Sequence, residues 1–522
     1  MSALASLSSI KQMSAPKKIL LDSTHFNEIR GSVHARTVAW DALVRSSEIS
    51  EADATIAKHL ESSLLAIQQT SGPSSAASSV RTATPSSQAL DHITSTEVES
   101  LLNLLRLSDN VDCVKAASNL ISELLSSDIS TLALDTISYF AENPAELETL
   151  FDLSFKPQFD NQTILISSFN MVSLLVQPSI EAPNLVQRLI TNEKFISIFN
   201  NTQQMDTCYV FVRLLGELCT VRKYRKLVWA NETLFLPTIF RIISGSRPGT
   251  VANTNTNPAA ATTAGGMDTA EHVVIVNTNA NNLGIQLQYY SLLLVWLLTF
   301  DAKIANEMTI KYLNEFLNLL KLVKVTIKQK VSRVSIAILL QCCSKEVRGH
   351  KTFIKNLILL GNGIPTLDSL SGRKYSDEEL REDIMALKGI LEEEYEALTS
   401  FDEYAAELNS KLLCWSPPHI DNGFWTDNID KFKSNNWKIF KQLISLLIEF
   451  KKKNEVDNGS RTTLQILLND ITHVIDYLPE SVAVLNQMNG KVVIMELMNN
   501  SDSRVKYEAL KATQAIIGYK MK

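Results

Sequence analysis

Apolar residues recur along this chain at the three- and four-residue spacing of amphipathic α-helices, and no stretch of comparable length alternates with period two. Three stripes toward the C-terminus show the spacing most clearly. They are Leu464, Leu467, Leu468, Ile471, Val474, Ile475 and Leu478; Ile439, Phe440, Leu443, Leu446, Leu447 and Phe450; and Val505, Ala509, Ala512 and Ile516. The pattern predicts an all-α protein.

One short segment conflicts with the helical pattern. Val482–Leu485 and Val492–Ile494 flank Asn489-Gly490, a dipeptide typical of β-hairpin turns. Because the surrounding sequence is so strongly helical, we expect two helices here instead. Gly490 is then expected near a helix C-terminal cap, where glycine accepts the left-handed conformation.

Several predicted helices share a valine followed three or four positions later by a small residue. The pairs are Val114 with Ala117, Val212 with Gly216, Val334 with Ala337, and Val505 with Ala509. Small residues on an inner face let a neighbouring helix approach closely. Helix pairs stacked in this way form armadillo or HEAT repeats of roughly 40–47 residues. The sequence therefore favours an armadillo/HEAT-like α-solenoid, with a multi-helix globular bundle as the alternative.

Three parts of the chain lack a helical pattern. Residues 71–88 consist largely of Ser, Ala, Thr and Pro, and residues 244–283 are rich in Asn, Thr, Ala and Gly. Such compositions bury too little apolar surface to offset the entropy of ordering. We expect both to be flexible insertions, with a regulatory phosphosite in the first as the alternative, and residues 1–20 to be a flexible N-terminal extension.

The length of 522 residues exceeds the ~250–300 at which a single hydrophobic core usually stops growing, so two domains are expected. Ser376–Glu379 and Ser400–Glu403 both have the pattern of a capping box, which starts a helix. The first predicted helix runs to about Ala397. The chain must then turn near Leu398-Thr399, which predicts a short hinge. We expect a large N-terminal helical-repeat domain over 21–398 and a small C-terminal one over 400–522.

Composition and charge narrow the function classes. The chain is 45% hydrophobic and 20% charged, with a formal charge of -6, which gives no overall attraction to nucleic acid. None of its six cysteines forms a CxxC pair, so a zinc site is not expected. Its most apolar window, Leu292–Leu298, is much shorter than the ~20 residues of a membrane span. We expect a cytoplasmic protein with no direct membrane insertion.

The sequence shows no complete motif of an ATPase, nuclease or metalloenzyme active site. Gly490-Lys491 is followed by Val492, where a phosphate-binding loop needs Ser or Thr. His419 and His473 lie among ordinary structural residues, so each is interpreted as structural. The acidic run between Asp377 and Glu403 is typical of a solvated helix face or a surface for basic partners. We therefore expect no catalytic residue, no cofactor and no metal.

The C-terminal stretch nevertheless carries a specific set of motifs, and further motifs follow the same order upstream. They are Ser400-Phe-Asp-Glu-Tyr404, Leu413-Cys-Trp-Ser-Pro-Pro-His419, Phe424-Trp425, Asn428, Asp470-Ile471, Pro479, Gly490-Lys491, Met495, Arg504–Leu510, Ala512 and Gln514, with Arg36, Trp40, Ile49-Ser50, Gln286–Tyr289, Trp296–Leu298, Phe300, Lys330-Val331 and Arg333 upstream. In order and spacing the chain resembles the H subunit of the vacuolar proton-translocating ATPase. It departs from that family's usual pattern at Gln341, Asn489 and Glu480-Ser481.

The resemblance implies a non-catalytic regulatory and linking component of the V1 sector. The N-terminal solenoid would hold the E and G subunits of the peripheral stalk, and the C-terminal domain would contact the cytosolic part of the membrane-sector a-subunit. When V1 is released, the C-terminal domain would bridge the B subunit and the central rotor, and so inhibit ATP hydrolysis. The implied location is the cytosolic face of the vacuolar membrane.

Five residues are candidate partner contacts. Trp415, Phe424 and Trp425 are large aromatics near a Pro-Pro turn, and either core packing or an interface anchor explains them. Arg504 and Lys506 near the start of the last helix face either a partner or water. A general armadillo or HEAT adaptor would explain the helices equally well, but not the ordered motifs after Ser400. An enzyme is the third alternative.

Overall fold

The computed structural model describes residues 17–19, 21, 23–36, 38–70, 90–107, 110–245, 283–398, 400–411, 413–453 and 458–519. Over these ranges the chain forms 27 α-helices and one 3-10 helix, and no strand. The all-α prediction is confirmed. The insertion predicted over 71–88, nearly all of that predicted over 244–283, most of the extension predicted over 1–20, and Thr399 lie outside the described residues. At the edges of the second insertion, Ser244 ends α13 and Leu283 begins α14.

Contacts group the described residues into two compact units. The first comprises residues up to 305 together with 326–338, and the second comprises 306–325 together with 339 onward. This division differs from the predicted boundary near residue 399. The difference arises because α20 (Glu378–Leu398) contacts α18 (His350–Leu359) and α19 (Gly363–Ser371) as well as α22 (Pro417–Ile420). The boundary at 398–400 remains a prediction.

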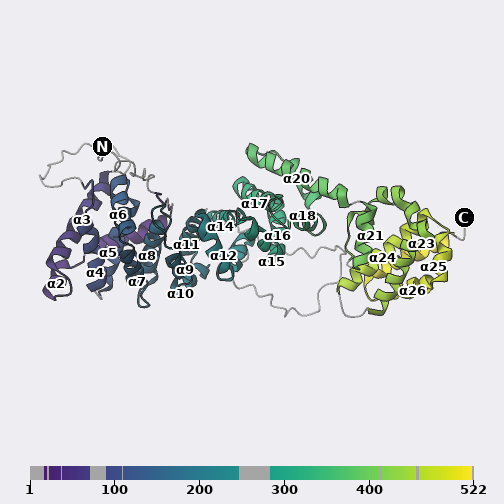
Figure 1. Cartoon of the computed structure of the whole chain (residues 1–522), viewed down its shortest axis with the longest axis horizontal. Helices are drawn as coiled ribbons and strands as arrows, with labels where there is room; N and C mark the ends of the chain where they lie inside the picture. The colour runs from purple at the N-terminus through teal and green to yellow at the C-terminus, as the bar shows by residue number, and fades with distance from the viewer. Residues whose placement is uncertain are drawn as a thin grey trace, which may run out of the picture. The chain divides into compact units, whose positions relative to one another are not determined.

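The first unit is built of successive α-helices and one 3-10 helix (Figure 1). In chain order they are α1 (Thr24–Ala35), α2 (Trp40–Arg45), α3 (Glu51–Thr70), α4 (Ser95–Leu107), α5 (Val111–Ser126), α6 (Ser130–Glu142), α7 (Pro144–Ser154), α8 (Asn161–Leu175), α9 (Pro183–Ile190), α10 (Glu193–Asn200), α11 (Met205–Thr220), α12 (Arg222–Ala230), η1 (Glu232–Leu234), α13 (Leu236–Ser244) and α14 (Leu283–Thr299).

Four of these helices form a row through the first unit: α5 packs on α8, α8 on α11, and α11 on α14. Every residue of α8 from Thr163 to Leu175 is buried, as expected for a helix with neighbours on several sides. Stacking of equivalent helices in this way is the arrangement of an α-solenoid. The solenoid prediction is confirmed.

The small residues of the predicted repeats do not all have the same environment. Ala117 on α5 is fully buried, as predicted. Gly216 on α11 is only partly buried, and a Cβ added there would meet no atom within 4 Å. The prediction that Gly216 permits close helix approach is wrong, because the side of α11 that carries it faces open space.

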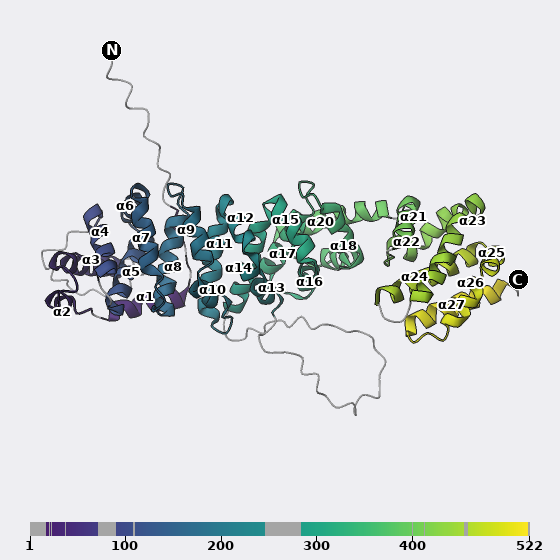
Figure 2. The ribbon, with the colours of Figure 1, turned by 60° about the horizontal axis from the view of Figure 1, so that its bottom comes forward.

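Helix α1 lies against the row, in contact with α5 and α11 (Figure 2). The segment before it is held to the turn after α8 and to α11: the amide of Lys17 donates to Oε1 of Gln177 at 2.9 Å, and Lys17 Nζ lies 3.1 Å from Glu217 Oε2. His34 on α1 pairs with the buried carboxylate of Glu123 on α5. The N-terminal segment is thus held by polar contacts as well as by apolar packing.

The remaining helices follow α14. Helices α15 and α17 each have residues in both units, and the others belong to the second unit. They are α15 (Ala302–Lys311), α16 (Leu313–Val325), α17 (Gln329–Cys342), α18, α19, α20, α21 (Phe401–Ser410), α22, α23 (Asn422–Lys453), α24 (Asn458–Tyr477), α25 (Ser481–Gln487), α26 (Gly490–Leu497) and α27 (Ser503–Tyr519).

The three predicted stripes lie on α23, α24 and α27. Helix α24 packs between the other two, and its stripe from Leu464 to Ile475 is buried throughout. Two helices also replace the possible hairpin, as predicted. The left-handed residue between them is Asn489, with φ 59°, and not Gly490. Gly490 instead begins α26, where a Cβ would lie 2.9 Å from Ile444, so close packing requires glycine there.

Capping side chains begin both α20 and α21. Ser400 caps α21 as predicted, accepting a hydrogen bond from the amide of Glu403 at 3.2 Å. Helix α20 begins one residue later than predicted, because the side chain of Asp377 accepts from the amide of Leu380 at 3.1 Å. Asp377, a good N-cap residue, thus contributes to the cap of α20, and a capping role of Ser376 remains a prediction.

Helix α23 contains a sharp break. Asn435, Asn436 and Trp437 all have left-handed backbone angles, with φ values of 50°, 57° and 61°. The left-handed conformation costs roughly 1–2 kcal/mol for an L-residue, although asparagine tolerates it better than most. Trp437 packs against the core of the second unit, and this packing helps to hold the strained turn.

We expect Asn436→Gly to raise the free energy of unfolding of the second unit by up to about 1 kcal/mol, because glycine adopts positive φ without a Cβ clash. Urea unfolding of the full chain, followed by hydrogen exchange of α23 amides, measures the change. Lys438→Gly is the matched control, because Lys438 has helical angles and should lose stability instead. Equal effects of the two substitutions would contradict the prediction.

Candidate functional site

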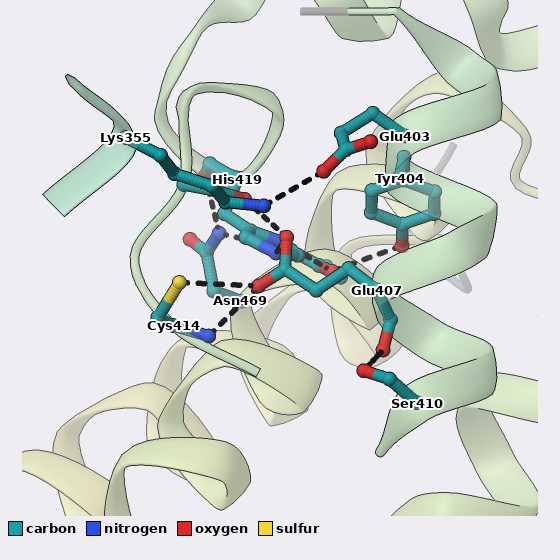
Figure 3. A network of polar contacts seen from close by, with 10 residues as sticks. Lys355, Glu403, Tyr404, Glu407, Ser410, Cys414, His419 and Asn469 are labelled. Atoms are coloured by element: carbon teal, nitrogen blue, oxygen red, sulfur yellow. Dashed lines mark hydrogen bonds and ion pairs between the residues drawn. The ribbon is translucent and has the colours of Figure 1, made fainter. Parts of the chain in front are cut away.

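A buried polar cluster joins four segments of the second unit (Figure 3). Tyr404 and Glu407 lie one turn apart on α21, and Ser416 lies in the segment that follows it. His419 is on α22, held there by the Pro-Pro start of that helix, and Asp470 comes from the middle of α24. Each of these side chains is buried. We refer to these five residues as the polar cluster.

Asp470 and Glu407 are the two acceptors of the cluster. Oδ2 of Asp470 accepts from Tyr404 Oη at 2.9 Å and lies 2.7 Å from Nδ1 of His419. Glu407 accepts from the hydroxyl of Ser416 at 2.7 Å and from the backbone amide of Cys414 at 2.8 Å. Nε2 of His419 lies 3.7 Å from Oε2 of Glu407, which is an ion-pair distance and too long for a hydrogen bond.

The imidazole of His419 lies between two carboxylates, and this fixes its charge. Burial by itself lowers the pKa of His419, but the attraction and hydrogen bond of Asp470 and the proximity of Glu407 outweigh burial and raise the pKa to about 9. Burial likewise opposes ionisation of Glu407, yet His419, the Cys414 amide and Ser416 lower the pKa of Glu407 to about 2. The cluster therefore holds an imidazolium between two carboxylates at neutral pH.

The residue types of the cluster resemble those of a nucleophilic triad, but the geometry does not suit catalysis. The hydroxyl of Ser416 donates to Glu407 and not to the imidazole, and the pKa of Glu407, lowered to about 2, makes this carboxylate a weak base. Burial and the nearby Glu407 raise the pKa of the Cys414 thiol to about 12, which keeps it protonated. The arrangement is suited to cross-linking α21, α22 and α24.

Two contacts extend the cluster. Nδ2 of Asn469 donates to the backbone carbonyl of His419 at 2.8 Å, which fixes the end of α22 on α24. On the other side, Nζ of Lys355 donates to Oε1 of Glu403 at 2.7 Å and so joins α18 to α21 (Figure 3). Glu403 and Glu407 lie on the same face of α21, one turn apart. One helix thus carries both the buried cluster and this partly exposed ion pair.

The candidate contact residues lie in two environments. Trp425 is 0% exposed and Phe424 is 3% exposed, and both pack with Tyr404 in the core. Trp425 also packs against Phe432. The indole of Trp425 also stacks on His473, with ring centroids 4.9 Å apart and planes 10° apart. The sequence left two alternatives open for these two residues, core packing and an interface anchor. In this structure both residues pack in the core.

The other three candidates remain accessible. Trp415 is partly buried against the core of the second unit. Arg504 and Lys506 are exposed in the first turn of α27, so both can reach a partner. Their role as partner contacts remains a prediction.

Sequence reasoning missed most of the polar cluster. It did not identify Glu407, although the spacing of Glu407 from Tyr404 places both on one helix face. Asp470 entered only as part of a motif, yet a carboxylate inside the apolar stripe from Leu464 to Ile475 signals a buried charge that needs a partner. His419 is structural, as interpreted, but it is paired and charged.

The opposite pKa shifts predict a pH window for the stability of the second unit. The raised pKa of His419 adds stability that is complete below its ordinary value of 6.5 and is lost as the pH rises through about 9. The lowered pKa of Glu407 adds stability that is complete above its ordinary value of 4.5 and is lost as the pH falls toward about 2.

We therefore expect the second unit to be most stable between pH 4.5 and 6.5 and to weaken toward pH 9. Urea midpoints across this range, read from hydrogen exchange in α24, measure the effect. In His419→Gln the alkaline decline should shrink, because the titrating group is gone. A wild-type midpoint that stays constant or rises toward pH 9 would contradict the assignment.

The described part of the chain holds neither a metal-binding group nor a membrane-spanning helix. Within it, no three or more His, Cys, Asp or Glu side chains are arranged to hold a metal ion. None of its helices is both long and apolar enough to cross a membrane.

The chain is similar to several proteins of one kind. Probable V-type proton ATPase H subunit 1 of Caenorhabditis elegans is 30% identical over 48% of this chain and 53% of that protein. Probable V-type proton ATPase H subunit 2 of the same organism is 30% identical over 44% of this chain and 47% of its own length. The V-type proton ATPase H subunit of Drosophila melanogaster is 28% identical over 47% and 49%. The chain spans about half the length of these relatives.

Two family models, both described as the H subunit of V-ATPase, match consecutive parts of the chain. The N-terminal model matches residues 24–391 and the C-terminal model matches residues 397–521. The first match alone covers more than half of the chain. The two-model pattern also agrees with the order of motifs on both sides of Ser400. The chain therefore belongs to the V-ATPase H-subunit family.

Proposed function

We propose that this chain is a non-catalytic regulatory and linking component of the V1 sector of a vacuolar proton-translocating ATPase. The observation that carries the proposal is the match of both H-subunit family models, in order, over residues 24–391 and 397–521. The structure supports a scaffold role in two ways. The first unit is a helical solenoid, and the His–carboxylate cluster of the second unit is buried and cross-links helices.

We further propose which partner each domain binds. The N-terminal repeat domain holds the E and G subunits of the peripheral stalk, since a solenoid offers an extended surface suited to elongated partners. The C-terminal domain contacts the cytosolic part of the membrane-sector a-subunit and so couples ATP hydrolysis to proton transport. Several modest contacts made by one chain hold such an assembly firmly through effective concentration. The chain would then lie on the cytosolic face of the vacuolar membrane, without inserting into it.

In released V1 we propose that the C-terminal domain bridges the B subunit and the central rotor. A bridge between a stationary and a rotating part stops rotation without any chemistry of its own. The movement requires a hinge near residue 399, between the C-terminal end of α20 and the Ser400 cap of α21. The Lys355–Glu403 pair joins the two sides of that hinge. Because both side chains are partly exposed, the pair is worth only about 0.2–1 kcal/mol and opens at little cost.

Affinity capture of the tagged full chain tests this function against that of a general adaptor. Under gentle lysis we expect the V1 subunits, E, G and B among them, to copurify in fixed proportion to the chain. Extraction with detergent should add the membrane-sector a-subunit. Capture of unrelated proteins without any ATPase component would contradict the proposal and favour a general armadillo or HEAT adaptor.

A further inference from the structure

Helix α27 is the last helix that the structure describes, and one of its faces is fully packed. Val505, Ala509, Ala512 and Ile516 point into the core and are at most 2% exposed. Through this face α27 packs on α24, and α26 lies beside it. Among the described helices α23 packs on α24 and α24 packs on α27, so α27 lies at the edge of this stack.

The opposite face of α27 is apolar as well. Tyr507, Leu510 and Ile517 are 64%, 49% and 55% exposed, with the exposed Gln514 among them. Their spacing of three and seven residues places these four side chains in one stripe along the helix. On α26 the side opposite the buried Ile494 likewise carries two exposed apolar residues, Val492 and Met495.

This composition is unusual for the end of a helix stack. A helix face that no other part of its protein covers is normally polar, because it must stay in water. Here two adjacent helices expose five large apolar side chains. Exposed apolar side chains gathered along one helix face, as on α27, are typical of an interaction surface.

The charges around the stripe select the kind of partner. Arg504 and Lys506 are exposed on either side of it. Glu508 is the only acidic residue of α27, and it is turned away from solvent, with a side chain 15% exposed that lies 3.7 Å from Lys511. On α26, Glu496 is paired with Lys451. The border of the stripe is thus basic, which disfavours a second copy of this chain and favours an acidic partner.

We propose that the outer faces of α26 and α27 bind an amphipathic helix of another protein, whose apolar stripe is bordered by Asp and Glu. Apolar residues of that helix at positions i, i+3, i+4 and i+7 would cover Tyr507, Leu510 and Ile517. Its acidic border would face the exposed ammonium group of Lys506. The inference deepens the proposed function by naming a surface for partner binding, and it rests on that function only for the identity of the partner.

A synthetic probe tests the surface directly. A fluorescently labelled helical peptide with leucines at i, i+3, i+4 and i+7 and glutamates beside them is titrated with the full chain, and anisotropy is recorded. The same peptide with lysines in place of the glutamates is the comparison. We expect the acidic peptide to bind at least about tenfold more tightly than the basic one at low salt.

Three variants locate the binding. Leu510→Asp should weaken binding of the acidic peptide at least about tenfold. It puts a negative charge, of the same sign as the glutamates of the peptide, at an apolar position that binding would bury. Lys506→Glu should reduce the difference in affinity between the acidic and the basic peptide. Ile420→Asp is the matched control, since Ile420 is a similarly exposed apolar residue on α22, and it should bind as the wild type does. All three substituted residues are exposed, and unchanged melting curves confirm folding.

Other results of these experiments would contradict either the inference or the proposed function. If neither peptide binds, if both bind equally, or if Leu510→Asp binds as tightly as the wild type, the inference is wrong. A concentration-dependent dimer in sedimentation, abolished by Leu510→Asp, would show that a second copy covers the face and would overturn it too. Failure of the wild-type chain to bind V1, with peptide binding intact, would instead contradict the proposed function alone.

Discussion

We expect His419→Ala to lower the free energy of unfolding of the second unit by about 3–5 kcal/mol, because it leaves two carboxylates buried without their cation. The lost imidazolium is the only cation within ion-pair distance of both Asp470 and Glu407 among the described residues. Tyr404, Ser416 and the Cys414 amide would still donate to these carboxylates. Hydrogen bonds from neutral groups compensate only part of a buried charge.

Hydrogen exchange of the full chain in urea measures this effect, because amides of α24 report the second unit separately from the first. His92→Ala is the matched control. His92 also pairs with an aspartate, at 3.0 Å from Asp135, but its side chain is largely exposed, so the loss should be within about 1 kcal/mol. A similar small loss for His419→Ala would mean that the polar cluster does not hold the helices together.

Trp425→Ala should be comparably destabilising, at about 3–5 kcal/mol, because it empties the centre of an aromatic core. The indole contacts Tyr404, Phe424, Phe432 and His473, and it is fully buried. The cavity that Trp425→Ala creates would lie beside Tyr404 of the polar cluster. We therefore expect the substitution to weaken both the aromatic core and the polar cluster. The thermal melting of the full chain gives the size of the loss.

Trp415→Ala is the comparison, since Trp415 comes from the same motif but is only partly buried. Its loss of stability should be smaller, and any loss of V1 binding at unchanged melting would identify Trp415 as a contact residue. For Trp425 the same result, unchanged melting with lost binding, would show that it is an interface anchor and would contradict the core assignment.

The helices were predictable because their apolar stripes are regular. In α24 the residues from Leu464 to Ile475 that were predicted to be buried are buried. The cap at Ser400 followed from local chemistry alone. These features depend on residues that are neighbours in sequence, and helical periodicity reports such relations directly.

Features that depend on distant residues were not predictable in the same way. Asp470 and His419 are 51 positions apart, and nothing in either local sequence indicates that they meet. Gly490 was expected to supply a left-handed cap, but its role is to allow close contact with Ile444 on α23. The exposed stripe of α27 is visible only once its opposite face is known to be packed.

The most direct test of the proposed function is the magnesium-dependent ATPase rate of a released V1 sector lacking this component, before and after the purified chain is added. We predict strong, saturable inhibition that requires residues 400–522. Binding without inhibition would leave a linking role and contradict the brake. Neither binding nor inhibition, with a folded chain and matched V1 components, would contradict the account as a whole.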